Sequence, residues 1–374
     1  MNRRLVLGAG AAAAAVALAV TALTGRDDPA EPDLEIGVTE HPYRIVYLLD
    51  DLADDAVEAS TDELWVRPPF DSRLETRAGA PPGAEVVAVQ VAVMDRLRIE
   101  ASDTPLVFAR VPGLAPSDVR MAPIVAAGEA AGLLERGEHR TVAGRRCQVL
   151  RSGTLLGAGP LVPITEDEHA ESCIDGDGLL LEETLFLGGR PTLHRRAVEI
   201  DLSPAIDDDL FAAGDIVLSV DQGGGSSRPV DPDSGAEGSF WVLPEAARPR
   251  GFAHVGRFSV ITPQTERFAE PGRSAVVAGT VDVFVRGADY VTVHQGGTLG
   301  RVPAFATPPD APAIDGGAVG AGALVLSATG SELRFPQTGG RFVHLAGTLP
   351  PDDLAMLARQ LEETEGSGLV YLDG

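Results

Sequence analysis

Short segments of alternating apolar and polar residues, separated by Gly, Pro and Asp, constrain this chain more than any other feature. Four of them lie at 43–49, 62–66, 73–77 and 84–93. A period of two, rich in β-branched and aromatic residues, is typical of strands in an antiparallel sheet. In the fourth segment Val87, Val89, Val91 and Val93 fall on one face. One face of the predicted sheet is therefore strongly apolar.

The periodicity changes at 116–137, where Ser117 and Asp118 are candidate helix caps. Pro123 argues against one straight helix, so the segment predicts either one helix or two short ones. A cover of Ala- and Gly-rich helices over 117–134 would pack loosely enough on the apolar face to admit a ligand. Further strands are expected at 146–152, 170–175, 179–187 and 194–202.

A segment rich in Gly, Ser, Pro and Asp at 221–239 predicts a flexible linker. After it, a smaller unit at 240–374 has strand patterns at 254–261, 275–287, 289–295, 323–329 and 341–347. Pro350 or Pro351 would open a closing helix whose stripe is Leu354, Leu357 and Leu361. The sequence thus predicts two domains, 38–220 and 240–374, joined by the linker.

Composition places the chain among globular proteins and restricts its partners. Hydrophobic residues make up 44% of the 374 residues and charged residues 23%. The formal net charge is −25, and all 30 basic residues are Arg. Such an acidic protein repels phosphate backbones and anionic lipid headgroups, so we expect no nucleic-acid partner.

The first 25 residues predict an export segment. Arg3 and Arg4 precede an uncharged, Ala-rich run over 5–25. Either the segment is cleaved as a signal peptide after Ala22, or it stays as a membrane anchor, since about 20 apolar residues can span a bilayer. In both cases we expect the rest of the chain to lie outside the cytoplasm.

No residue pattern predicts catalysis, a metal or a cofactor. Asp175 and Asp177 resemble the start of a calcium loop, but Leu179 and Phe186 occupy ligand positions, so a turn between strands is the better interpretation. The seven His residues show no metal-binding spacing, and neither a Gly-x-Ser-x-Gly elbow nor a phosphate loop is present. Asp207, Asp208 and Asp209 are interpreted as a solvated acidic run.

The two cysteines predict one structural disulfide. Exactly two Cys in an exported chain imply a bridge by default, here between Cys147 and Cys173. The strands at 146–152 and 170–175 would bring the sulfurs together if they pair in antiparallel fashion. A redox-active pair would favour closer spacing and a helix N-terminus, so we expect a structural role.

Two regions carry a resemblance to known families. The order of elements from "GLLERGEHRTVAGRRCQVLRSG" to "LHRRAVEIDL" resembles the second half of the lipoprotein-carrier superfamily, the LolA-like and RseB/MucB-like periplasmic proteins. The segments "FWVLPEAARPRGFAH" and "RFVHLAGTLPPDDLAMLARQLEE" are similar to the smaller second domain of RseB/MucB-like regulators, or to a DUF4367-like domain. In contrast to the family, the first strand follows almost directly on the N-terminal segment, without a preceding helix.

The resemblance implies an α+β fold in which a curved antiparallel β half-barrel is covered by short helices. A smaller α+β domain with an antiparallel sheet and a C-terminal helix would follow. It also implies a non-enzymatic role, either binding a lipid or acyl chain or sensing the state of the envelope. Trp65, Val87, Val89, Val91 and Val93 would line a ligand cavity or, equally, a filled core. The alternative partner is a membrane-anchored regulatory protein, such as an anti-sigma factor.

Overall fold

The computed structural model describes residues 32–52, 59–79, 84–93, 96–100, 106–109, 121–156, 160–214, 226–229, 239–264, 275–299, 311–327, 330–338 and 341–365. The predicted export segment, 1–25, lies outside the described residues. Ile36–Gly374 forms one compact unit. Among the described residues, no helix is both long and apolar enough to cross a membrane.

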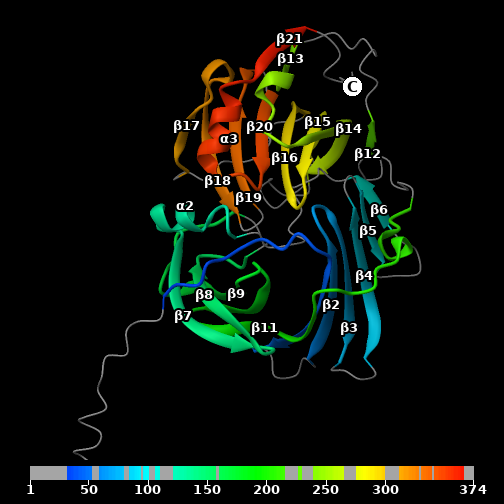
Figure 1. The fold of residues 1–374 in the computed structure, drawn as a ribbon, viewed down its shortest axis with the longest axis vertical. Helices are drawn as coiled ribbons and strands as arrows, with labels where there is room; N and C mark the ends of the chain where they lie inside the picture. Colours follow the sequence, from blue (N-terminus) through cyan, green and yellow to red (C-terminus); the bar gives the residue numbers. More distant parts are fainter. Residues whose placement is uncertain are drawn as a thin grey trace, which may run out of the picture. The chain divides into compact units, whose positions relative to one another are not determined.

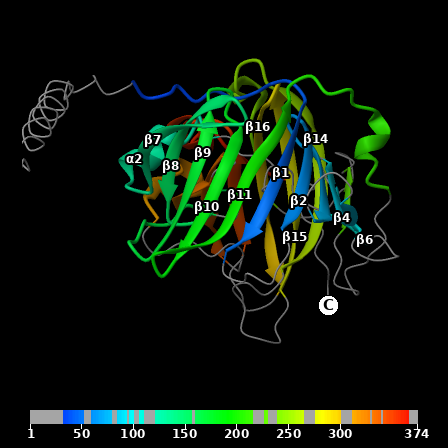
Figure 2. The same ribbon diagram turned by 90° about the horizontal axis from the view of Figure 1, so that it is seen from below.

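The larger sheet has eleven antiparallel strands in the order β6-β5-β4-β3-β2-β1-β11-β10-β9-β8-β7. Figure 2 shows β8, β9, β10, β11, β1 and β2 side by side in this order. The chain thus returns through β11 to pair with β1, which joins two meanders in one sheet. The strands are Tyr43–Asp51 (β1), Ser60–Arg67 (β2), Asp71–Ala78 (β3), Glu85–Val93 (β4), Arg96–Glu100 (β5), Leu106–Ala109 (β6), Leu134–Val142 (β7), Arg145–Ser152 (β8), Glu168–Asp175 (β9), Leu180–Leu187 (β10) and Arg190–Asp201 (β11).

The second sheet has eight antiparallel strands in the order β12-β14-β15-β16-β20-β19-β18-β17. A separate pair, β13 and β21, lies near it (Figure 1). These strands are Ser226–Pro229 (β12), Ser239–Val242 (β13), Ala253–Gln264 (β14), Ala275–Arg286 (β15), Asp289–Leu299 (β16), Ala313–Asp315 (β17), Ala321–Ser327 (β18), Gly330–Pro336 (β19), Arg341–Gly347 (β20) and Glu362–Glu365 (β21).

Helices are few and short. They are α2 (Val125–Ala130), α3 (Pro351–Ala358) and three 3₁₀ turns, η1 (Asp208–Phe211), η3 (Glu245–Ala247) and η4 (Gly317–Val319). Helix α3 begins with Pro351 and buries Leu354, Leu357 and Ala358, as its apolar stripe predicts. It packs against β19 and β20 (Figure 1). The predicted α+β class, dominated by antiparallel sheet, is therefore confirmed, whereas the half-barrel shape stays a prediction.

The structure corrects the helix predicted over 116–137. Within the described part of that segment the helix spans Val125–Ala130, and a strand already begins at Leu134. Gly132 takes a φ of +68°, which ends the helix and lets the chain turn into β7. The apolar residues Leu133 and Leu134, which suggested another helical turn, instead lead into a strand, so the predicted helical cover is shorter than expected.

Residues 226–229 of the predicted linker depart from the expected flexible segment, because they form β12 and pair with β14. The rest of that segment, apart from Ser239, lies outside the described residues. The two-domain division stays a prediction. The sheets nevertheless share an apolar cluster, in which Leu150 and Ile174 of the larger sheet pack with Val293 and Leu345 of the smaller one.

Candidate functional site

The predicted lining residues gather on one face of the larger sheet. In register, Trp65 lies opposite Arg73, and Val91 lies opposite the same arginine from the next strand. Paired residues point to the same face, so Trp65 and Val91 share a face. Val89 and Val91 are 9% and 2% exposed, with Trp65 and Val93 packed beside them. Val87, by contrast, is 51% exposed, so only part of the predicted stripe forms the cluster.

A segment of the chain itself covers this cluster. We call residues Ile206–Gly214 the strap; it follows β11 and contains η1. Phe211 and Ala213 are 3% and 5% exposed because they pack on Val89 and Val91. Its turn η1 contacts β3 and β4. The apolar face is thus covered by a segment that contains a 3₁₀ turn and no strand.

Arginine side chains of the sheet hold the backbone of the strap. The Nη1 atoms of Arg73, Arg98 and Arg96 donate to the carbonyl oxygens of Leu210, Ala212 and Gly214 at 3.3, 3.0 and 2.8 Å. Leu210 lies in η1, and Ala212 and Gly214 follow it, so the three bonds hold the last part of the turn and the residues after it. All three acceptors are backbone atoms, so these bonds do not depend on which side chains the strap carries.

Carboxylates on the sheet hold these arginines in position. Arg73 donates through Nε and Nη2 to Glu75, at 3.0 and 2.7 Å, and Arg98 donates through Nη2 to Glu100. Each acid follows its arginine by two residues and therefore lies on the same face. A guanidinium has a rigid fork of donors, so one edge can bind the acid while the other binds the strap.

The acidic start of the strap is anchored by a fourth arginine. Arg67 Nη1 donates to Asp208 Oδ1 at 2.7 Å, and the same guanidinium lies 4.8 Å from the ring centre of Phe211. Asp207 accepts a hydrogen bond from the backbone N–H of Asp209 at 3.1 Å and so caps η1. Asp207, Asp208 and Asp209 are all exposed, which confirms the solvated acidic run, and Asp207 and Asp208 make these local contacts at the surface.

The opposite face of the sheet is filled by side chains. Successive residues of a strand point to opposite faces, so Val66 lies on the face opposite to Trp65. Val66 and Ile45 belong to an apolar cluster on that face that includes the two cysteines. The sulfurs of Cys147 and Cys173 are bonded, as predicted, and link the antiparallel neighbours β8 and β9. Ile45, Cys147 and Leu181 are at most 1% exposed, so this part of the face is a packed core.

The turn that resembled a calcium loop is held by hydrogen bonds. Asp175, 1% exposed, accepts from the backbone N–H groups of Asp177 and Leu179, both at 2.9 Å, and from Arg145 Nε at 2.6 Å. Its carboxylate therefore stabilises the turn between β9 and β10. No group of three or more metal-ligating side chains occurs among the described residues.

Glu183 is a buried acid on β10 that the strand pattern did not single out. It accepts hydrogen bonds from Ser172 Oγ at 2.9 Å and from the backbone N–H of Leu156 at 2.8 Å. Burial raises the pKa of this carboxyl, and nearby Arg195 opposes the rise. Neighbouring Glu182 has other partners, including His194 at 3.2 Å, so the two acids form no carboxylate pair. Glu183 thus fixes the loop after β8 to the sheet.

Sequence reasoning found the apolar stripe and missed the strap. Neither Phe211 nor Ala213 lies in a periodic segment, and an arginine that binds a backbone carbonyl leaves no motif. The sequence does contain one sign of this arrangement, the two Arg-x-Glu sequences at 73–75 and 98–100. The first lies on the predicted strand at 73–77, and the second follows the predicted strand at 84–93.

Comparison with known proteins gives distant structural likenesses. No family model matches the chain, and no curated protein matches it either. A complex of Pseudomonas aeruginosa MucA and MucB is similar over 87% of this chain and 94% of that one, with 16% identity and a TM-score of 0.32. The structure of MucB alone is similar over 86% of this chain and 92% of MucB, with 15% sequence identity and a TM-score of 0.31. A LolA superfamily protein from Nitrosomonas europaea is similar over 48% of this chain and 93% of its own, with 11% sequence identity and a TM-score of 0.23.

These structures represent the two groups of proteins that the sequence resembles, so the predicted likeness is confirmed. With TM-scores below 0.5, the likeness carries no argument about what this chain binds. The similarity of the C-terminal part to a DUF4367-like domain stays a prediction.

Proposed function

We propose that this chain is an exported, non-enzymatic regulatory protein that binds a short acidic and apolar segment of a membrane-anchored partner. The observation that carries the proposal is the strap. Four arginines and an apolar cluster hold a peptide segment that has acids at its start, a 3₁₀ turn, and the apolar side chains Phe211 and Ala213. We call the surface beneath it, formed by Trp65, Arg73, Val89, Val91 and Arg98, the strap face.

The chemistry of the strap face favours a peptide over a lipid. Arginine donors to three backbone carbonyls suit a polypeptide, whereas an acyl chain has no acceptors to offer them. Desolvating these guanidinium groups under a hydrocarbon would cost free energy without a compensating hydrogen bond. The charge also fits, because the arginines of the strap face attract an acidic segment even though the whole chain is acidic.

A partner segment must displace the strap to reach this face. The strap is tethered, so its effective concentration at the face is in the millimolar range or above. A partner therefore binds well only if it makes more contacts than the strap does, or if the strap has been released. This competition makes the interaction switchable, as a regulatory role requires.

The proposal is tested by adding the strap sequence as a separate peptide. Phe211→Ser with Ala213→Ser removes the apolar anchors, and Trp241→Phe leaves Trp65 as the sole tryptophan of the chain. A synthetic peptide with residues 204–214, PAIDDDLFAAG, should then change Trp65 fluorescence saturably. Adding Arg98→Gln should weaken binding about tenfold, because a charge-assisted hydrogen bond is lost. Arg140→Gln, on β7 away from the strap, serves as the matched control.

Three outcomes would count against this function. The peptide gives no saturable change, a scrambled peptide binds equally well, or Arg98→Gln and Arg140→Gln weaken binding to the same extent. Uptake of a fluorescent fatty acid by the same variant, without peptide binding, would instead support the lipid-binding role that the sequence first suggested.

A further inference from the structure

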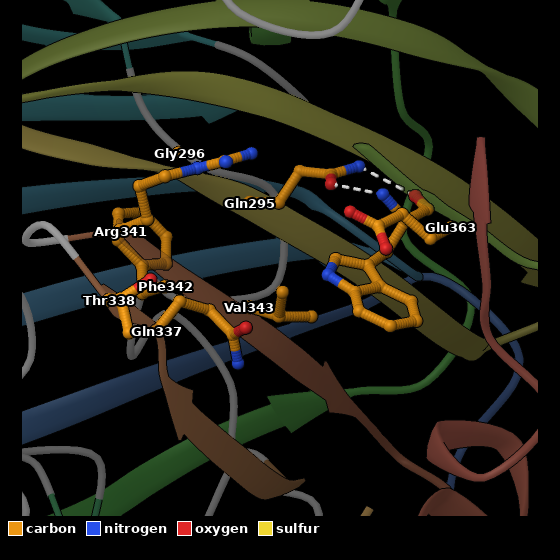
Figure 3. Close-up of a pocket in the computed structure, with 9 residues that line it drawn as sticks. Gln295, Gly296, Gln337, Thr338, Arg341, Phe342, Val343 and Glu363 are labelled. Carbon is orange, nitrogen blue, oxygen red and sulfur yellow. Dashed lines mark hydrogen bonds between the residues drawn. The ribbon is translucent and has the colours of Figure 1, made fainter. Parts of the chain in front are cut away.

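A small pocket in the second half of the chain lies apart from the strap face. It is about 190 Å³ in volume and is bounded by β13, β16, β20 and β21. Figure 3 shows Gln295, Gln337, Arg341 and Glu363 around it. Sites for drug-sized ligands are typically about 300–1,000 Å³, so this pocket suits a smaller molecule.

The strand pairing places an aromatic ring and an acid side by side in the pocket wall. Trp241 on β13 lies directly opposite Glu363 on β21, and both line the pocket. On the main sheet Arg341 lies opposite Gly297, and Val343 lies opposite Gln295. The β13–β21 pair and the eight-stranded sheet therefore both line this pocket.

The pocket walls are fixed without a ligand. Gln295 Oε1 accepts from the backbone N–H of Trp241, and Gln295 Nε2 donates to the carbonyl of the same residue, both at 2.7 Å (Figure 3). Gln337 Nε2 donates to the carbonyl oxygen of Val319 at 2.8 Å. Because these side chains are already ordered, a ligand would lose little free energy in ordering them.

The lining combines groups that a single ligand type satisfies. Arg341 offers only donors, Glu363 only acceptors, and the amides of Gln295 and Gln337 offer both. The indole of Trp241 adds a flat apolar surface. An acyl chain would desolvate Arg341 and Glu363 without offering a hydrogen bond to either, and a simple ion of either sign would meet one group of like charge. A hydroxyl both donates and accepts, and a sugar ring adds a face of C–H groups for the indole.

We propose that this pocket binds a single pyranose sugar ring, with its C–H face on Trp241 and its hydroxyls on Arg341 and Glu363. The site is separate from the strap face and does not depend on peptide binding there. It would give the exported protein a means of contacting a carbohydrate of its surroundings.

Gly297 provides a way to close the pocket. A Cβ atom added at this residue would meet no other atom within 4 Å, and its φ is not in the left-handed region. Its side chain would point to the same face as Gln295, two residues earlier on β16. Gly297→Leu should therefore fill space beside Arg341 without straining the strand.

The test uses the full chain with Trp65→Phe, so that Trp241 is the sole tryptophan. Glucose and N-acetylglucosamine are the probes, and glycerol and leucine are controls for a short polyol and a zwitterion. At least one sugar should change Trp241 fluorescence saturably, with a dissociation constant on the order of 1 mM, as expected for so small a ligand. Glu363→Gln and Gly297→Leu should each weaken binding at least tenfold.

Glu362→Gln is the matched control, because it is the same change one residue earlier on β21 and points away from the pocket. Circular dichroism should show that all variants are folded. The proposal is overturned if neither sugar gives a saturable change up to about 100 times the expected constant. It is equally overturned if Glu362→Gln weakens binding as much as Glu363→Gln, or if glycerol or leucine binds as tightly as the sugars.

Discussion

Individual arginines have two roles in this chain at once. Arg73 and Arg98 each bind an acid on their own strand with one edge and a strap carbonyl with another donor. A lysine ammonium has no such fixed fork and could not maintain both contacts in one geometry. The absence of lysine from the chain is therefore compatible with a strap face built on guanidinium groups.

His294 is the residue at which we expect acid to act on stability. It is 1% exposed on β16 and lies opposite His344 on β20. His344 in turn lies opposite Arg334 and is hydrogen-bonded to Glu332 at 3.2 Å. Burial lowers the pKa of His294 to about 3, and His344 adds to this effect. In the unfolded chain the pKa of the exposed imidazole is about 6.5. The unfolded state therefore binds a proton first as pH falls, and the folded state loses stability between pH 6.5 and 3.

We predict that His294→Leu makes the protein less sensitive to acid. Over pH 6.5 to 4.5 the free energy of unfolding of the parent should fall by up to about 1.4 kcal/mol per pH unit more than that of the variant. Urea unfolding at pH 7.5, 5.5 and 4.5 measures this difference. Below pH 4.5 Glu332, whose pKa is lowered to about 2 despite its burial by His344 and Arg334, adds a further loss in both proteins. Parallel pH profiles for the two proteins would show that His294 does not titrate on unfolding.

At the scale of elements, the disulfide joins two neighbouring strands and should stabilise the larger sheet. Cys147 and Cys173 close a loop with a sequence separation of 26. Cys147→Ala with Cys173→Ala should lower the free energy of unfolding by about 3 kcal/mol, mainly because the unfolded chain gains freedom. Chemical denaturation measures the change, and reduction of the parent protein should lower it by a similar amount. A loss below about 1 kcal/mol would mean that the packed β8–β9 pair needs no cross-link.

Strands were predictable where alternation decides burial, and less so elsewhere. β1 to β4 and β8 to β11 fall on the predicted segments because each has a clear period of two. β5 and β19 were missed, since Arg96, Arg98 and Arg334 break the apolar pattern while their side chains pair with acids or backbone carbonyls. β6 was also missed, because its four residues are too few to show a period. β7 was mistaken for helix because Leu133 and Leu134 continue a helical-looking run. A local sequence pattern identifies a strand or helix only where contacts with neighbouring strands do not outweigh the local preference.

The candidate sites were less predictable than the fold. The stripe of Val89, Val91 and Trp65 was visible in the sequence, but its cover was not, since the strap meets it from more than 100 residues away. The sugar pocket depends on the pairing of Trp241 with Glu363, which is set by β21. That strand follows α3 in a segment where the sequence predicted the helix to continue. Both sites are formed by contacts between segments that are far apart in the sequence, and such contacts are difficult to predict from a single sequence.

At the scale of the whole molecule, the two sheets are joined by more than the chain between them. Leu161 on the long connection after β8 donates its backbone N–H to the carbonyl of Leu326 at 2.7 Å. The shared cluster also includes Phe335 and Leu354, both at 0% exposure. The strap leaves the end of β11 and leads toward the second sheet in sequence. Its release from the strap face would therefore free part of the connection between the sheets.

The central claim is that the strap face binds a membrane-anchored partner, and cross-linking in the cell envelope tests it most directly. A photoreactive benzoylphenylalanine replaces Val87, which is exposed on β4 two residues before Val89. The same residue at Val255, 43% exposed on β14, is the control. We predict one dominant cross-linked membrane-anchored protein from Val87, a weaker product with Arg98→Gln, and none from Val255. No product from Val87, or the same product from both positions, would contradict the account.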